Sequence, residues 1–345
     1  MFKGIDLYSD TITKPTRAMR LAMVEAEVGD EQKGEDPTTL RLEQRMAKLL
    51  GHASSMFFPS ATMANEIAIR LHCSPGDELL AAEDCHLFFA EAGGPAVHSG
   101  VSCKPIAAPN GIFSGDDVRE RHRWNKGPHY PVTRLVSVEN TTNMGGGVPW
   151  SGEQLGDVLK AARELELKTH LDGSRLFNAA AASGLTPKEI ATRFDTVTVC
   201  FSKGLGCPTG AILAFDQTHW KTVRRLKQLF GGAMRQSGIL AAAALYALDH
   251  HVERLIEDHE NAQLLAERLA TIAALEIETL PPPSNMVFFR WQSKDISDVE
   301  FLNRCVAKGL RFSHVGVNRF RAVTHMDVTR PDMEKAAEIV AEICR

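Results

Sequence analysis

The chain of 345 residues lacks the features that mark several large classes of protein. No apolar run approaches the roughly 18 residues of a membrane-spanning helix. The first ten residues, MFKGIDLYSD, contain no apolar core of a secretory signal peptide. Positive charge is not in excess, because Lys and Arg total 39 against 43 Asp and Glu, and proteins that bind nucleic-acid phosphates usually show the opposite balance. These absences predict a protein that binds neither membranes nor nucleic acid.

Closely paired cysteines are also missing. The seven cysteines form no C-x-x-C pair, so their spacing suits neither a zinc site nor the dense disulfide framework of a small secreted domain. We therefore predict reduced thiols, no metal site and a cytoplasmic location. Hydrophobic residues make up 44% of the chain and charged residues 24%, which are ordinary globular values. Internal repeats and low-complexity tracts are absent as well.

Short apolar runs alternate with helix-like stretches over the first two thirds of the chain. This alternation predicts βαβ units and a largely parallel sheet. Ser151 and Gln154 fit a capping box at the start of one helix. Strands are expected over residues 55–60, 77–83, 133–140, 168–175, 195–204 and 210–216, and helices over 61–73 and 151–167.

The pattern changes near residue 239. A long, nearly glycine-free stretch over residues 239–275 predicts a long helix that joins two parts of the chain. Beyond a PPPS interruption we expect a strand over 285–291, a helix over 298–310, a strand over 321–328 and a closing helix over 330–345. The sequence therefore predicts a large domain of residues 1–245 and a small C-terminal α+β domain of residues 246–345.

Polar segments lie where predicted strands end, which is where ligands bind in open α/β sheets. Lys203 follows an apolar strand in a glycine-rich turn, where a lysine can form a Schiff base or can simply be an exposed loop residue. Asp172 can hold a pyridinium nitrogen, and Arg175 can bind a carboxylate through a bidentate fork. The alternative is that Asp172 caps a helix and that Arg175 is exposed.

A third segment, PSATMAN, places small hydroxyl residues at a strand-to-helix junction. Ser60 and Thr62 offer backbone N–H groups and a helix dipole to a phosphate, although Ser60 can also be a plain N-cap. Together the three segments supply a phosphate cradle, an acid for a ring nitrogen and a lysine for an aldehyde. Pyridoxal phosphate (PLP) needs this combination.

These residues lie within a series of segments that resembles the threonine aldolase family of PLP-dependent lyases. The resemblance runs from Asp6 to the C-terminus. It includes the segments DLYSDTIT, GEDPT, PSATMAN, CHLFFAEAGG, RLVSVENT, HLDGSRLFNA, CFSKGLGCPTGA, GGAMRQSG and RAVTHMDV. It implies the aspartate-aminotransferase-like fold type I, an α/β fold with a large PLP-binding domain, a mostly parallel central sheet and a small C-terminal α+β domain.

The resemblance also implies a role at each matching position. Lys203 would form the Schiff base with PLP, Asp172 would pair with the pyridine nitrogen, and His86 would stack on the ring. The other implied roles are phosphate binding by Ser60, Ala61, Thr62 and Arg235, the last in a neighbouring subunit's site, and carboxylate binding by Ser9, Arg175 and Arg321.

The implied reaction is cleavage of the Cα–Cβ bond of a β-hydroxy-α-amino acid of the L-threonine or L-allo-threonine type, which gives glycine and an aldehyde. Clamping the carboxylate would hold that bond perpendicular to the cofactor plane and so select it for cleavage. The family resemblance further implies a homotetramer, a dimer of dimers in which two subunits complete each site.

Two positions depart from the family pattern. The family reads ENTH where this chain ends in Thr142, and the missing histidine would hold the substrate's β-hydroxyl. Thr142 can donate or accept a hydrogen bond there, but its hydroxyl is no base near pH 7. Lys33 replaces the family's tyrosine before GEDPT, which would place a cation beside the substrate.

These departures leave several readings open. The enzyme can be an ordinary low-specificity aldolase in which His86 or a water serves as the base. Its substrate can differ, with Lys33 favouring the acid of 3-hydroxyaspartate or the small Thr142 making room for phenylserine. Another PLP reaction, such as β-elimination or transaldol transfer, is a third reading. A non-catalytic PLP-binding protein is the fourth.

Overall fold

The computed structural model of the protein describes residues 2–123, 127–292 and 295–344. A seven-stranded sheet lies at its centre, in the order β2-β8-β7-β6-β5-β3-β4. β8 runs antiparallel to both of its neighbours, and the other pairings are parallel. The strands are β2 (Ser54–Phe58), β3 (Asp77–Ala82), β4 (Ser102–Ile106), β5 (Val132–Glu139), β6 (Lys168–Gly173), β7 (Thr196–Cys200) and β8 (Ala211–Phe215).

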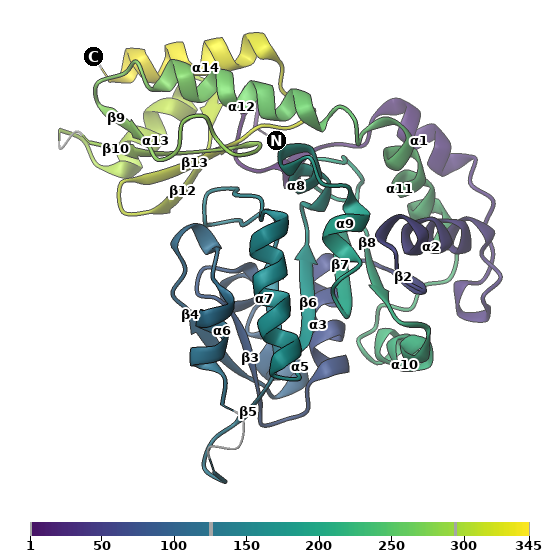
Figure 1. Ribbon diagram of the computed structural model, residues 1–345. Helices are drawn as coiled ribbons and strands as arrows, with labels where there is room; N and C mark the ends of the chain where they lie inside the picture. The colour runs from purple at the N-terminus through teal and green to yellow at the C-terminus, as the bar shows by residue number, and fades with distance from the viewer. Residues whose placement is uncertain (1, 124–126, 293–294, 345) are drawn as a thin grey trace.

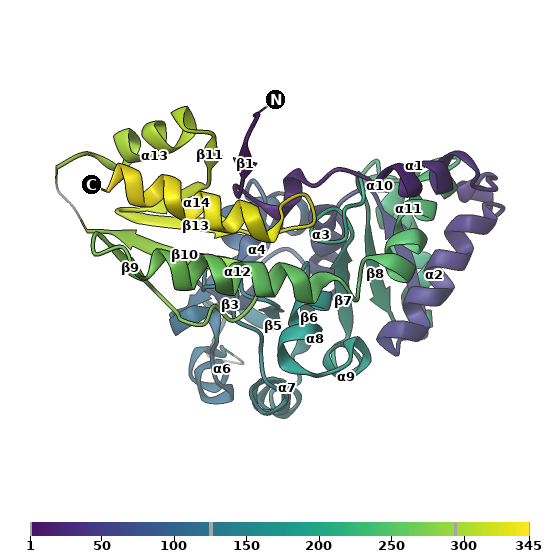
Figure 2. The ribbon, with the colours of Figure 1, turned by 90° about the horizontal axis from the view of Figure 1, so that it is seen from above.

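Helices cover both faces of this sheet, so that its inner strands are buried (Figures 1 and 2). β2, β7 and β8 are buried at every residue, which explains their apolar runs, such as AILAF in β8. One face is covered by α3 (Ala61–His72) and α5 (Gly94–Ser99). The other is covered by α6 (Gly115–Arg121), α7 (Gly152–Glu164), α8 (Leu176–Ser183) and α9 (Pro187–Ala191).

Three helices pack together beside the β2–β8 end of the sheet (Figure 1). They are α1 (Arg17–Val24), α2 (Pro37–Leu50) and α11 (Gly238–His250). Asp36 caps α2 by accepting a hydrogen bond from the Thr39 backbone N–H, and Pro37 occupies the first helical turn, where its missing N–H costs nothing. α10 (Trp220–Leu229) lies below this group.

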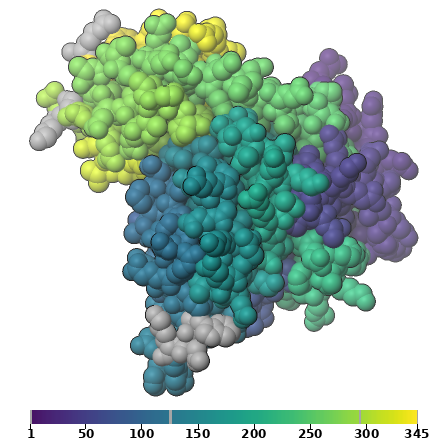
Figure 3. Space-filling model, in the orientation of Figure 1, coloured from purple at the N-terminus to yellow at the C-terminus, as the bar shows by residue number. Residues whose placement is uncertain are grey.

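A smaller antiparallel sheet, in the order β12-β13-β10-β9, lies over one end of the central sheet (Figure 1). In the space-filling view the C-terminal part of the chain, green to yellow, sits above the teal central part (Figure 3). Phe289, Phe301 and Phe320 dominate its core, and Leu7 from the N-terminal segment is part of the same cluster. The elements of this unit are β9 (Leu275–Ile277), β10 (Met286–Trp291), β12 (Ser313–Gly316), β13 (Arg319–Val323), α12 (Leu255–Leu269), α13 (Asp298–Ala307) and α14 (Arg330–Ile343).

The N-terminal segment reaches this smaller unit before the chain enters the central sheet. β1 (Ile5–Asp6) pairs in parallel with β11 (Leu310–Arg311), so residues at opposite ends of the sequence lie side by side. The predicted division into residues 1–245 and 246–345 stays a prediction. Within the described residues, no helix is long and apolar enough to cross a membrane.

The α/β fold with a mostly parallel central sheet and a separate small unit is confirmed, as is the capping box of Ser151 and Gln154. Two finer predictions are wrong. The helix expected over residues 239–275 is two helices, α11 and α12, interrupted at residues 251–254. The strand expected over residues 321–328 ends at Val323. The break between α11 and α12 and the end of β13 are fixed by contacts with residues that are remote in sequence.

Candidate active site

A pocket of about 520 Å³ lies between the carboxyl ends of the central strands and the small antiparallel sheet. Segments from distant parts of the chain form its wall, as expected for an open α/β sheet. Predicted site residues that line it are Ser9, His86, Arg175, Lys203 and Arg321, and they are joined there by Tyr8, Phe89, Asn143 and Val315.

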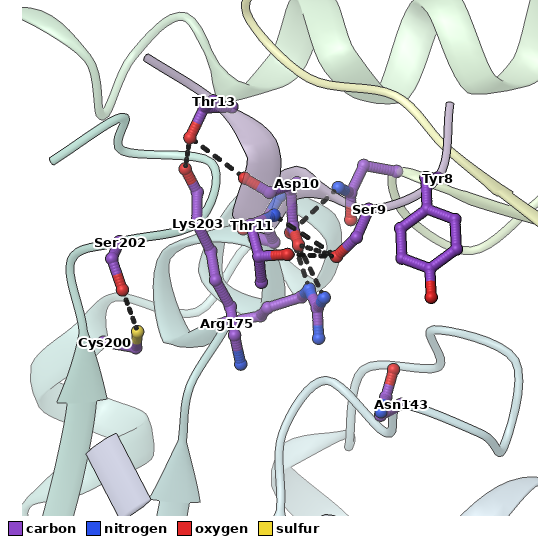
Figure 4. Close-up of polar contacts among 12 residues, drawn as sticks. Tyr8, Ser9, Asp10, Thr11, Thr13, Asn143, Arg175, Cys200, Ser202 and Lys203 are labelled. Atoms are coloured by element: carbon purple, nitrogen blue, oxygen red, sulfur yellow. Dashed lines mark hydrogen bonds and ion pairs between the residues drawn. The ribbon is translucent and has the colours of Figure 1, made fainter. Parts of the chain in front are cut away.

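Lys203 enters the pocket from the turn after β7. The Thr13 hydroxyl donates a hydrogen bond of 2.9 Å to the Lys203 carbonyl, which ties this turn to the N-terminal segment. The Lys203 amine has no hydrogen bond or ion pair with any residue that the structure describes, and it points into the same space as the Arg175 guanidinium (Figure 4). An amine so placed is available to a ligand.

Asp172 is a buried carboxylate at the end of β6. Its Oδ2 accepts a hydrogen bond of 3.0 Å from Asn65, and its Oδ1 accepts one of 3.1 Å from the Ser174 backbone N–H. Burial opposes ionisation, but the charges of Lys203 and His86 outweigh it and lower the pKa of Asp172. Asp172 is therefore a fixed anion in the floor of the pocket.

His86 begins the short helix α4 (His86–Phe89) above this floor. Its Nδ1 donates a hydrogen bond of 2.8 Å to Glu91, and its backbone N–H donates one of 3.0 Å to Glu139. Burial opposes protonation of the ring, yet the bond to Glu91 and the charge of Asp172 raise the pKa of His86. The imidazole is thus held in one orientation on the pocket wall.

Arg175 does not offer its whole guanidinium to the pocket. Its Nε and Nη2 each donate a hydrogen bond of 2.7 Å to the two carboxylate oxygens of Asp10 (Figure 4). Although burial works against ionisation, Arg175 holds the pKa of Asp10 well below its usual range. The pair with Asp10 uses two of the five N–H donors of the guanidinium, so Nη1 and the second N–H of Nη2 remain for a substrate.

Arg321 lies on β13 and reaches the pocket from the small sheet. Its Nη1 donates a hydrogen bond of 2.6 Å to the Asn143 side-chain oxygen. Its Nε is buried without a hydrogen-bond partner among the described residues. Burial, followed by the charge of Arg175, lowers the pKa of Arg321 to about 10. Within the described residues, the positive charge of Arg321 is not balanced by an ion pair with a carboxylate, and an anionic ligand would supply the missing negative charge.

The start of α3 lies next to the floor of the pocket, since Asn65 of this helix contacts Asp172. Ser60 is the N-cap, and its hydroxyl accepts a hydrogen bond of 3.2 Å from the Met63 backbone N–H. The next two positions, Ala61 and Thr62, are partly exposed. Ser60 therefore caps the helix, and the first backbone N–H groups of α3 remain available for an anion.

Thr142 is not in the pocket wall. Its hydroxyl is buried and accepts a hydrogen bond of 3.1 Å from the Val148 backbone N–H. The side chain packs closely against Gly111, where an added Cβ would lie 2.9 Å from the Thr142 methyl group. The predicted contact of Thr142 with a substrate is not supported, and the neighbouring Asn143 faces the pocket instead.

Lys33 and Arg235 also lie apart from the pocket within this chain. Lys33 lines a separate hollow beside α2 and α10, together with Gly34. Arg235 is exposed and forms an ion pair of 3.0 Å with Asp30. The prediction that Lys33 faces the substrate is not supported within one chain, whereas Arg235 was expected to serve a neighbouring subunit.

Sequence reasoning missed the residues that hold the site in place. Asp10, Asn65, Glu91 and Asn143 lie within or beside the segments that carry the family resemblance, but nothing in their spacing marks them. Each acts by hydrogen bonding to a predicted site residue. Such supporting contacts form only when distant segments meet, so local patterns carry little signal for them.

The residues present fit PLP. An unpartnered lysine amine, a buried aspartate that stays ionised and a helix N-terminus with free N–H groups surround one floor of the pocket. They match an aldehyde, a protonated pyridine nitrogen and a phosphate, respectively. Lys203, Asp172 and the start of α3 would hold the cofactor in that order.

Comparison with known proteins agrees with this geometry. The family model described as beta-eliminating lyase matches residues 6–292. A low specificity L-threonine aldolase from Escherichia coli is 39% identical over 341 residues, which cover 98% of this chain and 97% of that protein. The threonine aldolase of Leishmania major has a TM-score of 0.84 at 20% identity, covering 99% of this chain and 100% of that one.

A more distant structure shares the fold. A serine palmitoyltransferase variant from S. paucimobilis with a bound PLP–myriocin adduct has a TM-score of 0.76 at 16% identity, and the match covers 99% of this chain and 87% of that chain. The predicted fold type I architecture is confirmed. Because both the family model and the relatives match nearly the whole chain, the protein belongs to the beta-eliminating lyase family and, within it, to the low-specificity threonine aldolases.

Proposed function

We propose that the protein is a PLP-dependent lyase that cleaves the Cα–Cβ bond of a β-hydroxy-α-amino acid of the L-threonine or L-allo-threonine type. The products are glycine and an aldehyde. One observation carries the proposal: Lys203, Arg175 and Arg321 line a single pocket, and the buried anion Asp172 lies beside His86 in its wall. Bound PLP supplies the electron sink that such a cleavage requires.

The two arginines orient the substrate. Arg321 gains a counter-ion when a carboxylate binds, which relieves its repulsion from Arg175. Nη1 of Arg175 and the Ser9 hydroxyl complete the carboxylate site. Holding the carboxylate in this way fixes which bond at Cα is presented for cleavage, and orientation of this kind can supply several kcal/mol, on the order of 7 or more in favourable cases.

His86 is the residue that holds or moves the proton of the β-hydroxyl. It lines the pocket beside Asp172, and an imidazole ordinarily titrates near neutrality. His314 also lines the pocket, but its Nε2 is bonded to Asp298. Thr142 has no part in this step, because its hydroxyl is bonded to Val148. The loss of the family's histidine at position 142 therefore leaves the aldol cleavage to His86.

The active form is a homotetramer in the cytoplasm, in which two subunits complete each site. Neither Arg235 nor Lys33 lines the pocket of its own chain, and Arg235 acts on the cofactor phosphate in the site of a neighbouring copy. The large domain of residues 1–245 supplies the cofactor site. The small domain of residues 246–345 contributes Arg321.

The decisive experiment combines product release with trapping of the lysine. Purified enzyme should release glycine and acetaldehyde from L-threonine, and borohydride should fix PLP covalently on Lys203. Lys203→Ala should lose the covalent adduct and about a thousandfold or more of the activity, because the nucleophilic step is removed. Lys335→Ala, at an exposed lysine on α14, is the matched control and should behave as wild type. A reducible adduct in Lys203→Ala contradicts the assignment.

A larger apolar β-substituent is a second candidate, because Tyr8, Phe89 and Val315 line the outer part of the pocket. The exposed fractions of Tyr8 and Phe89 are 48% and 53%, so both rings are available for contact. An acidic β-substituent has less support, since Lys33 lies elsewhere. Comparing kcat/KM for threonine, phenylserine and 3-hydroxyaspartate separates these substrates. A preference for the diacid would contradict this ranking.

A further inference from the structure

Behind His86 lies a pair of buried glutamates that the proposed reaction does not use. Glu91 follows α4, and Glu66 lies on α3. Their exposed fractions are only 3% and 2%. The two side chains are neighbours, because Asn65, next to Glu66 on α3, bonds to Glu91, and the charge of Glu91 raises the pKa of Glu66. Two neighbouring buried carboxylates cannot both stay ionised without a large energetic cost.

Glu91 is already bonded on the side that faces the pocket. Its Oε1 accepts hydrogen bonds from His86 Nδ1 at 2.8 Å and from Asn65 Nδ2 at 3.0 Å. Among the described residues, no group donates a hydrogen bond to its Oε2. Glu91 is therefore the carboxylate of the pair, and it has one oxygen left for a further donor.

Glu66 has no such donors. Neither of its carboxyl oxygens has a hydrogen-bond partner among the residues that the structure describes. The carboxyl group packs against Gly94, where an added Cβ would lie 2.3 Å from Glu66 Oε1, so this position has no room for a side chain. A proton on Glu66 turns this unsatisfied group into a donor to Glu91.

The surrounding groups favour that proton. Burial, followed by the negative charge of Glu91, raises the pKa of Glu66 to about 9. Cys103 on β4 carries no negative charge near pH 7, since the pKa of its thiol is raised to about 11. Toward the pocket the pair meets His86, with the Asp172 anion beyond it.

The remaining neighbours contribute no cation to the pair. His170 on β6 hydrogen-bonds to the Asn65 side-chain oxygen, and burial lowers its pKa to about 4, so it is neutral. Glu139 on β5 accepts from the His86 backbone N–H. Within the described residues, His86 is thus the side chain in direct contact with the pair that gains a positive charge when it is protonated.

We propose that Glu66 and Glu91 share one proton, and that this shared proton sets the charge state of His86. The Glu66 O–H donates to Oε2 of Glu91 and takes up part of its negative charge. Glu91 then holds the proton on His86 less tightly than an unassisted carboxylate would. Glu66 is a positioning residue that acts through Glu91, and its importance for catalysis rests on the proposed role of His86.

The test reads His86 directly. Histidine labelled with ¹³C at Cε1 is incorporated into the holoenzyme, the His86 signal is assigned by its loss in His86→Asn, and its pKa is measured by NMR. Three further variants are compared: Glu66→Leu removes the donor, Glu66→Gln keeps a neutral donor, and Glu43→Gln is the matched control. Glu43 is another glutamate shielded from solvent, and it bonds to the Phe57 backbone N–H away from the pocket.

We expect Glu66→Leu to raise the pKa of His86 by about half a unit to one unit, because Glu91 regains its full charge. Glu66→Gln should restore the wild-type value, and Glu43→Gln should leave it unchanged. An unchanged pKa in Glu66→Leu overturns the proposal, as does a Glu66→Gln value equal to that of Glu66→Leu.

Infrared spectroscopy provides a second readout that needs only the Gln variant. The pKa values of Glu43 and Glu139 are raised to about 7, so the readout is the wild-type minus Glu66→Gln difference spectrum at pH 7. It should contain the C=O band of one protonated carboxyl group, and a difference spectrum without that band overturns the proposal. Neither readout depends on turnover, so an enzyme that shows both effects but releases no glycine would contradict the proposed function alone.

Discussion

The floor and the wall of the pocket are built in opposite ways. The floor holds anions that are fully bonded inside the protein, as Asp172 is bonded to Asn65 and Ser174. The wall holds cations that are incompletely bonded, since the Lys203 amine has no partner among the described residues and Arg321 has an orphaned Nε. The hydrogen bonding of the floor is complete within the protein itself. The hydrogen bonding of the wall is completed only when ligands bind.

This difference assigns separate tasks to the two sides. A fully bonded carboxylate keeps its charge and position whether or not a ligand is present, which suits a group that must hold a protonated ring nitrogen. Partly bonded cations gain stability when an anion arrives, which suits groups that capture a substrate carboxylate. Changes in the floor should therefore lower kcat, and changes at the two arginines of the wall should mainly raise KM.

The largest expected effect comes from the floor. Asp172→Asn keeps the shape of the side chain but removes the anion, so kcat for L-threonine should fall by about 10²–10³-fold. Steady-state kinetics with saturating PLP measures this fall. Asp249→Asn, at an exposed ion pair with Arg45, is the control and should stay within about twofold of wild type. Comparable activity of Asp172→Asn and wild type would contradict the fixed-anion role.

Substitution of an arginine in the wall should mainly change KM. Arg321→Lys retains the charge but loses the planar fork, so KM should rise by about 10–100-fold while kcat changes less. Arg290→Lys, on β10 at an exposed ion pair with Glu278, serves as the control. If Arg321→Lys lowered kcat with KM unchanged, the division between floor and wall would be wrong.

Thr142 belongs to neither side, and its substitution should separate stability from activity. Thr142→Val keeps the shape but leaves the buried Val148 N–H without its acceptor, which should cost about 1–3 kcal/mol of folding stability. Thermal unfolding measures this loss, and kcat/KM should remain near the wild-type value. A selective loss of kcat/KM with unchanged stability would return Thr142 to the site.

The smallest effect is the pH dependence of stability that Glu66 contributes. Its pKa is raised from 4.5 to about 9 in the folded protein, so the folded state holds this proton more tightly than the unfolded chain does. The contribution is fully present below pH 4.5 and is lost as the pH rises through about 9. The Tm of Glu66→Gln relative to wild type should therefore increase between pH 6 and pH 9.5 by on the order of 2–4 °C. A Tm difference that does not change with pH would contradict the assignment of this proton to Glu66.

The strands and most helices could be predicted because their signals are local. Apolar runs such as those of β7 and β8 and the capping box at Ser151 depend only on neighbouring residues. The break between α11 and α12 could not be predicted in this way. His251 leaves the helix there to bond the Leu205 carbonyl at 2.8 Å, and neither glycine nor proline marks the position.

The residues of the site also divide into those that local sequence predicts and those that it does not. Lys203, Asp172 and the start of α3 follow strands directly, so strand ends and residue type were sufficient to nominate them. The orientation of Arg175 toward Asp10, separated by 165 positions, depends on how the N-terminal segment crosses the pocket. Thr142 was misplaced because a motif gives the position of a residue in the chain but not the direction of its side chain.

The N-terminal segment has a consequence for how the enzyme can be switched off. Within ten residues it pairs with β11, contributes Leu7 to the small sheet's core and supplies Asp10 to Arg175, and Thr13 then fixes the Lys203 turn. A protease that trimmed the first thirteen residues would leave every strand of the central sheet intact. It would nonetheless leave the Arg175 guanidinium without Asp10, remove the hydrogen bond that ties the Lys203 turn, and detach the small unit from its parallel partner. Proteolytic nicking at this end is thus a route to inactivation that spares the core.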